Sequence, residues 1–86
     1  MDPSLDEVRQ VIRDRVKQAL GIELKSDDQH FFLEAGVDSL AFLNVVSALE
    51  KTYLVKFAND TLPDLATCSL LASGLVDLLA KKKAAG

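Results

Sequence analysis

The chain has 86 residues, of which 49% are hydrophobic and 27% are charged, so it can build one small core and is too apolar to stay disordered. Its formal net charge of -3 opposes binding to phosphate backbones and anionic lipids, so we expect no nucleic-acid partner and no stable membrane association. A single cysteine, Cys68, and an N-terminus without the blocks of a secretion signal favour a reducing, cytoplasmic setting.

A first amphipathic helix is predicted over about residues 5–20. Ser4 and Glu7 have the spacing of a capping box, in which a serine hydroxyl accepts a hydrogen bond from the amide three residues further on. Apolar residues then recur at three- and four-residue steps: Leu5, Val8, Ile12, Val16 and Leu20. Gly21 follows where a helix end often needs a residue with positive φ, so the helix should end there.

Residues 22–38 show no periodicity and are predicted to form a long connection. Loops of this length without regular structure are uncommon in small domains and are often functional. We expect Phe31, Phe32 and Leu33 to attach this loop to the core. His30, just before them, is interpreted as an ordinary polar loop residue.

A second helix is predicted from about Ser39 to Tyr53, with its first amides capped by the side chain of Ser39 itself or of Asp38. One face of this helix is apolar at helical spacing and should contact the core. The expected core stripe consists of Phe42, Val45, Leu49 and Tyr53.

The C-terminal third should contain a short and a long helix. Pro63, after a run of polar residues, marks a turn and a possible one-turn helix between residues 59 and 65. A last helix should begin near Thr67, and its expected core residues are Leu70, Leu71, Leu75, Leu78 and Leu79. Cys68 is interpreted as a small core residue. Residues 81–86, with three lysines, are predicted to be a flexible basic tail.

No segment shows the alternation of apolar and polar residues that is typical of a strand, and no internal repeat is present. The expected fold is therefore all-α, a four-helix bundle of three main helices and one short helix, with a long loop between the first two helices. We expect one domain over residues 1–86, with a helical core at about 5–80.

The most informative segment is Gly36-Val37-Asp38-Ser39-Leu40. Here a glycine turn leads into a serine at the start of an amphipathic helix, where its hydroxyl is predicted to be exposed. A phosphate ester on that oxygen would lie beside free backbone amides at the positive end of the helix dipole. The position therefore suits a serine that carries a phosphate group.

This segment resembles the attachment motif of the acyl carrier protein family, and the resemblance extends over about residues 5–80. The order of elements is similar, as are three further stretches: Ala48-Leu49-Glu50-Lys51-Thr52-Tyr53, Leu65-Ala66-Thr67 and Leu71-Ala72. A five-residue match alone is weak evidence. Agreement in spacing, length, acidity and helical order makes the resemblance specific.

The resemblance implies that Ser39 carries a 4'-phosphopantetheine arm, added from coenzyme A by a phosphopantetheinyl transferase. Gly36, Asp38 and Leu40 would belong to the same cofactor-attachment motif, with Asp38 and Leu40 read by the transferase. The arm would carry an acyl or aminoacyl group as a thioester, so the chain itself would be a carrier rather than an enzyme. We expect a free-standing monomer that meets acyl- or aminoacyl-loading enzymes and other enzymes of its pathway.

The second helix departs from the family pattern on its exposed face. Fatty-acid-synthesis carriers typically have several acidic residues there, which engage basic patches on enzymes. This chain has almost none, so we predict a specialised carrier whose partners make apolar and hydrogen-bonding contacts. The predicted docking residues are Leu40, Ala41, Leu43, Asn44 and Ser47. Leu54 also stands where such carriers often have glycine, so the chain is expected to turn differently there.

Three alternative functions stay open. The aspartate before Ser39 favours an acyl carrier, whereas the missing acidic face and the Phe31-Phe32 pair favour an aminoacyl or peptidyl carrier. An unmodified helical interaction module would instead use an apolar patch around Leu43 and Val46. A hydrolase using His30 is disfavoured, because an α/β hydrolase needs a sheet and an ordered oxyanion hole.

The second helix has more apolar residues than one core stripe requires. Leu40, Leu43 and Val46 accompany the stripe, and the amide shifts of Leu43, Val46 and Leu71 are expected to depend on the length of an attached acyl chain. In carriers of this family the bundle can shelter an acyl chain between helices. We therefore expect these residues to line a groove for the cargo.

Overall fold

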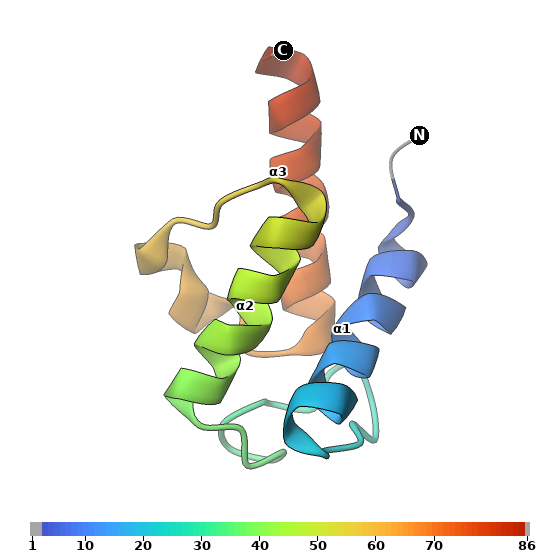
Figure 1. Cartoon of the computed structure of the whole chain (residues 1–86), viewed down its shortest axis with the longest axis vertical. Coiled ribbons are helices and arrows are strands. Elements are labelled where there is room, and N and C mark those ends of the chain that lie inside the picture. Colours follow the sequence, from blue (N-terminus) through green and yellow to red (C-terminus); the bar gives the residue numbers. More distant parts are fainter. Residues whose placement is uncertain (1–2, 86) are drawn as a thin grey trace.

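The computed structural model describes residues 3–85, and the side chains of residues 3–83 (Figure 1). Three α-helices and one 3-10 helix follow one another: α1 (Leu5–Leu20), α2 (Ser39–Tyr53), η1 (Asn59–Asp64) and α3 (Cys68–Ala85). The part of the chain so described has no strand, which confirms the predicted all-α bundle. In Figure 1, α1 runs opposite to α2 and α3, and it packs against both of them.

Helix α1 begins and ends where the sequence predicts. The Ser4 hydroxyl accepts a hydrogen bond of 3.2 Å from the Glu7 amide. At the other end, Gly21 adopts a left-handed conformation with φ of 68° and donates its amide to the Lys17 carbonyl at 2.9 Å. The residues buried along α1 are Val8, Ile12 and Val16, so the middle of the predicted apolar stripe contacts the core, whereas Leu5 at its start is exposed.

The loop over residues 22–38 is fastened to the first turn of α3 and to the segment just before it. Phe31 is buried, and its amide donates to the Ala66 carbonyl at 2.8 Å. The Ser69 amide donates to the Asp27 carbonyl at 2.9 Å. The expectation for Leu33 is wrong, because its side chain is 83% exposed. The backbone contacts bury Phe31 and leave Leu33 on the outside of the turn.

Helix α2 is capped by Asp38, whose Oδ1 accepts a hydrogen bond of 2.7 Å from the Ala41 amide. Phe42, Val45 and Leu49 are buried as predicted, together with Val46, whereas Tyr53 is half-buried. The helix therefore contacts the core along a wider face than the single stripe expected.

The C-cap of α2 is Leu54, which has the left-handed conformation that glycine favours, with φ of 56° and ψ of 47°. The expectation that replacing glycine changes this turn is therefore wrong. The side chain of Leu54 is exposed, so the unfavourable φ does not force this side chain against buried residues.

Helix α3 begins at Cys68, where the Thr67 hydroxyl accepts a hydrogen bond of 3.1 Å from the Leu70 amide. Leu71 and Leu75 are fully buried, as predicted, but the expectation for Leu70 is wrong because it is 47% exposed. Ala72, which is not among the predicted core residues, is fully buried. Leu78 and Leu79 pack against the core while remaining partly exposed.

The prediction of a tail after residue 80 is also wrong, because α3 continues to Ala85. Lysine and alanine are good helix formers, and cations suit a helix C-terminus. Lys82 also donates from Nζ to the Leu54 carbonyl at 2.7 Å, which ties the last turns of α3 to the end of α2. Residue 86 lies outside the described residues.

The short helix η1 confirms the element predicted around Pro63. No helix within residues 3–85 is long and apolar enough to cross a membrane.

Candidate cofactor attachment site

Ser39 is the first residue of α2 and is exposed. Its hydroxyl makes no hydrogen bond with any residue that the structure describes. Within the same residues, the amides of Ser39 and Leu40 also have no acceptor, because no helical turn precedes them and the Asp38 side chain caps the Ala41 amide. A free hydroxyl thus lies beside two free amides at a helix N-terminus, an arrangement that suits a phosphate ester.

Gly36 and Val37 turn the chain so that the next residues project outward. Gly36 has a φ of 75°, which side-chain-bearing residues rarely adopt, although a Cβ there would meet no atom within 4 Å. Glycine is therefore needed for its backbone conformation rather than for space. Val37 is buried and its amide donates to the Phe31 carbonyl at 2.8 Å, so the chain is anchored just before Ser39 is presented.

An apolar pocket of about 260 Å³ opens beside Ser39, between the start of α2 and η1. Phe32 and Phe42 meet in it edge to face, with ring centroids 5.2 Å apart. The residues that line the pocket are Phe32, Ser39, Phe42, Leu43, Leu62 and Pro63. A volume close to the lower end of the usual range for ligand pockets suits a short apolar group.

The residues predicted to line a cargo groove lie in different surroundings. Leu43 lines the pocket, but Leu40 does not, and its side chain is 71% exposed. Val46 and Leu71 are core residues with 3% and 0% of their surfaces exposed. Of the apolar patch expected for an unmodified interaction module, Leu43 is exposed and Val46 is buried.

The predicted docking residues lie around Ser39 on α2. Leu40, Leu43, Asn44 and Ser47 are exposed, and Ala41 is half-buried. No residue between Ser39 and Leu49 is charged. Glu50, the first acid that follows, is not free, because its Oε2 accepts a hydrogen bond of 2.8 Å from the Phe57 amide. The exposed face of α2 is therefore uncharged from Ser39 to Leu49, and exposed Lys51 follows in its last turn.

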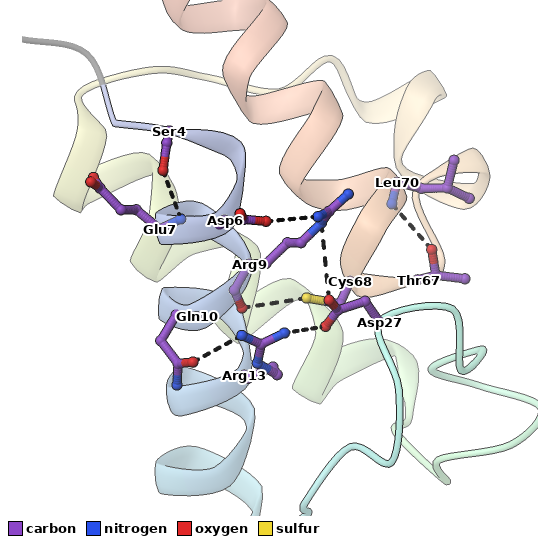
Figure 2. A network of polar contacts seen from close by, with 10 residues as sticks. All are labelled: Ser4, Asp6, Glu7, Arg9, Gln10, Arg13, Asp27, Thr67, Cys68 and Leu70. Atoms are coloured by element: carbon purple, nitrogen blue, oxygen red, sulfur yellow. Dashed lines mark hydrogen bonds and ion pairs between the residues drawn. The ribbon is translucent and has the colours of Figure 1, made fainter.

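The sequence interpretation missed an ionic cluster that holds the loop, shown in Figure 2. The carboxylate of Asp27 pairs with Arg13 and lies 4.0 Å from Nε of Arg9. The Arg13 hydrogen bond holds the pKa of Asp27 below its usual value despite partial burial. Burial, followed by the negative charge of Asp27, raises the pKa of the Cys68 thiol to about 12. Cys68 is therefore an inert core residue, as predicted.

His30 also has a role that the sequence interpretation missed. Its Nδ1 accepts hydrogen bonds from the amides of Phe32 at 3.2 Å and Leu33 at 3.1 Å. These contacts are local to one turn and offer no partner for a hydrolytic triad. A side-chain cap two or three positions before the amides that it accepts is a recognisable signal when the residue is serine or aspartate, but histidine is seldom expected there.

Comparison with known proteins agrees with the geometry of the site. Residues 10–75 match the family described as the phosphopantetheine attachment site. The chain is also 34% identical over 64 residues to two anthracycline acyl carrier proteins, DauA of Streptomyces sp. (strain C5) and DpsG of Streptomyces peucetius. Each alignment covers 74% of this chain and 76% of the relative.

These matches imply a 4'-phosphopantetheine prosthetic group. The residues present fit such a group, because a phosphodiester needs an accessible hydroxyl and gains from unpaired amides, and both occur at the start of α2. The group supplies the thiol on which cargo is held as a thioester. The chain therefore belongs to the acyl carrier protein family and carries biosynthetic intermediates by means of phosphopantetheine.

Proposed function

We propose that Ser39 is the residue to which the phosphopantetheine arm is attached. The observation that carries the proposal is the exposed hydroxyl of Ser39 at the mouth of α2, without a partner among the described residues. A hydroxyl engaged as a helix cap would have to break that bond before reacting. Because Asp38 supplies the cap, the Ser39 hydroxyl can react without loss of helix stability.

The donor of the arm is coenzyme A, and the catalyst is a phosphopantetheinyl transferase. The Ser39 oxygen forms a new bond to the phosphorus next to pantetheine, and the pyrophosphate bond of coenzyme A breaks. The adenosine bisphosphate leaves with the electron pair of that bond, while the hydroxyl proton passes to a base of the transferase. The carrier chain itself catalyses none of these steps and contributes the accessible oxygen and its setting.

The test is the mass of the intact protein after incubation with coenzyme A and a broad-specificity transferase. The unsubstituted protein should gain one phosphopantetheine, and Ser39→Ala should gain nothing. Ser73→Ala is the matched control, because Ser73 is also exposed on a helix but belongs to α3, outside the Gly36–Leu40 motif; it should gain mass like the unsubstituted protein. An equal gain in Ser39→Ala would refute the proposal.

We further infer that the cargo is an acyl group. The two relatives named above are acyl carriers, and Asp38 before the serine agrees with that class. An aminoacyl or peptidyl cargo remains the second candidate because the face of α2 lacks acids. Loading of the holo protein by an acyltransferase, compared with loading by a stand-alone adenylating enzyme, separates the two. Transfer of an amino acid alone would contradict the acyl assignment.

We propose that the pathway enzymes dock on the uncharged face of α2 through Leu40, Ala41, Leu43, Asn44 and Ser47. Support comes from the exposure of Leu40 and Leu43 and from the absence of charge between Ser39 and Leu49. Apolar contacts are weakly affected by salt, whereas contacts with basic patches weaken as salt screens them. Binding to a cognate enzyme should therefore change little between low and high salt and should weaken in Leu40→Asp.

We also propose that a short acyl chain rests in the pocket beside Ser39. The pocket is apolar and includes Leu43 and Leu62, so burial of cargo there removes apolar surface from water. Amide chemical shifts of Leu43 and Leu62 should change with the length of the attached chain. Unchanged spectra from a short to a medium acyl chain would contradict the proposal that the pocket shelters the cargo.

The cytoplasmic setting, the monomeric state and the single domain over residues 1–86 stay predictions from the sequence.

A further inference from the structure

The side chain and the carbonyl of His30 together close the turn that follows it. The Nδ1 atom accepts the amides of Phe32 and Leu33, and the carbonyl accepts those of Glu34 and Ala35, each at 3.0 Å. Because all of these backbone groups are donors, Nδ1 is the nitrogen with the lone pair and the ring proton lies on Nε2. Every amide from residue 32 to residue 35 is thus bonded to the same residue.

A continuous set of contacts connects His30 with the start of α2. The His30 ring packs on Phe32 with centroids 5.8 Å apart, and Phe32 packs edge-on against Phe42 at 5.2 Å. Phe32 and Phe42 are walls of the pocket that also includes Ser39. The Phe42 amide donates to the Asp38 carbonyl at 2.9 Å, in the first turn of α2. The turn at His30 and the serine therefore share one packed unit.

We propose that His30 is a positioning residue for the modification of Ser39, acting through the turn over residues 30–35 and through Phe32. The inference rests on the proposed attachment at Ser39. With its Nδ1 acceptor in place, the turn is closed before the transferase arrives. Without it, the amides of Phe32 and Leu33 lose their partner, and the enzyme has to order the turn on binding. Such an ordering cost raises KM and leaves kcat unchanged.

Two substitutions separate the acceptor from the ring. In His30→Asn, Oδ1 stands two bonds beyond Cβ, as Nδ1 does in histidine, and asparagine is a good capping residue. In His30→Phe, the aromatic ring and its contact with Phe32 can persist, but no acceptor is present. If the acceptor is what matters, asparagine should preserve the function and phenylalanine should not.

The experiment uses the full chain and measures the rate of phosphopantetheine transfer from coenzyme A at increasing carrier concentration. For His30→Phe, loss of the cap should raise KM about three- to tenfold, with kcat within about twofold of the unsubstituted value. For His30→Asn, both constants should stay within about twofold. Amide hydrogen exchange at Phe32 and Leu33 should be faster in His30→Phe only. Thermal unfolding by circular dichroism gives a temperature at which all three proteins are folded.

The possible results separate this inference from the one on which it rests. An unchanged KM in His30→Phe, or an equal rise in His30→Phe and His30→Asn, would overturn the positioning role while leaving attachment at Ser39 intact. Absence of any mass gain in the unsubstituted protein would instead overturn the attachment itself, and the positioning role with it. A raised KM confined to His30→Phe, with faster exchange at the two amides, supports the proposal.

Discussion

The two ends of α2 differ in whether their hydrogen-bonding groups have partners. At the N-terminal end, Asp38 caps a single amide, while the Ser39 hydroxyl and the amides of Ser39 and Leu40 have no partner among the described residues. The exposed residues that follow are uncharged as far as Leu49. This end leaves reactive and hydrogen-bonding groups available to a ligand or an enzyme.

At the C-terminal end, the amide and carbonyl of the C-cap residue and a nearby carboxylate all make hydrogen bonds. The Leu54 amide donates to the Glu50 carbonyl, and the Leu54 carbonyl accepts from Lys82. The Glu50 carboxylate accepts from the Phe57 amide. These three groups at the C-terminal end thus have partners, whereas the Ser39 hydroxyl and two amides at the N-terminal end have none among the described residues. The N-terminal end of α2 therefore presents the groups on which the proposed attachment rests, and the C-terminal end is held by its own contacts.

The largest expected effect concerns the ionic cluster that holds the loop leading to the N-terminal end. Asp27→Asn should lower the free energy of unfolding at neutral pH by about 1–2 kcal/mol, because it removes a charged hydrogen bond to Arg13 that is only partly screened. Urea unfolding measures the loss. Asp28→Asn, at the neighbouring exposed position, should change stability little; an equal loss there would contradict the role of Asp27.

The same pair makes a prediction about pH. Because Arg13 lowers the pKa of Asp27 in the folded chain, the stabilisation is fully present above the unfolded pKa of about 3.9 and is lost as pH falls through the folded value. The unsubstituted protein should therefore lose stability more steeply than Asp27→Asn below about pH 4, and the two should converge in stronger acid. Parallel curves would show that the pair does not contribute.

Loss of the cap should weaken the N-terminal end directly. Asp38→Ala leaves the Ala41 amide without its acceptor and should cost about 1 kcal/mol in unfolding free energy. Asp38→Asn retains an acceptor and should cost less than half as much in a urea titration. If both substitutions cost the same, the charge of Asp38 rather than its capping bond would be what stabilises the helix.

A substitution at the C-terminal end of α2 can stabilise the protein, because the backbone of Leu54 is strained. Leu54 has a left-handed conformation that costs a side-chain-bearing residue about 1–2 kcal/mol. Glycine at this position would remove that cost, but part of the gain is offset because glycine has more conformational freedom in the unfolded chain. Leu54→Gly should raise the free energy of unfolding by about 0.5–1 kcal/mol. Leu54→Ala keeps the strain and should not stabilise, whereas stabilisation by alanine would mean that the exposed leucine side chain is the unfavourable element.

The smallest effect is expected for the lysine that contacts Leu54. Lys82→Met removes the hydrogen bond to the Leu54 carbonyl and should cost about 0.3–0.5 kcal/mol, since the contact is exposed. Amide exchange of residues 81–85 should become faster, because the last turns of α3 lose their attachment to α2. Lys25→Met, in the loop, serves as the control and should leave that exchange unchanged.

Much of the fold could be predicted from local sequence. The bounds of α1 follow from the Ser4 cap and from Gly21, and the core faces follow from helical spacing. The errors lie where local pattern carries no information. Burial of Phe31 and exposure of Leu33 depend on a backbone bond to Ala66, which no periodicity reveals.

The site was predictable to a similar extent. Asp38 and Ser39 are neighbours in a short motif, so their roles could be assigned without the structure, although attachment at Ser39 stays a proposal. The salt bridge between Arg13 and Asp27 joins residues 14 apart in the chain, and one of them lies in a loop without pattern. The cap supplied by His30 was missed because serine, threonine, asparagine and aspartate are the residues expected in that role.

The most direct test of the account locates the arm within the modified chain. After transfer from coenzyme A, the protein is digested and its peptides are sequenced by tandem mass spectrometry. We predict phosphopantetheine on the peptide that contains Ser39 and on no other serine of the chain. An arm found on a different serine, or on none, would contradict the claim that the N-terminal end of α2 is the attachment site.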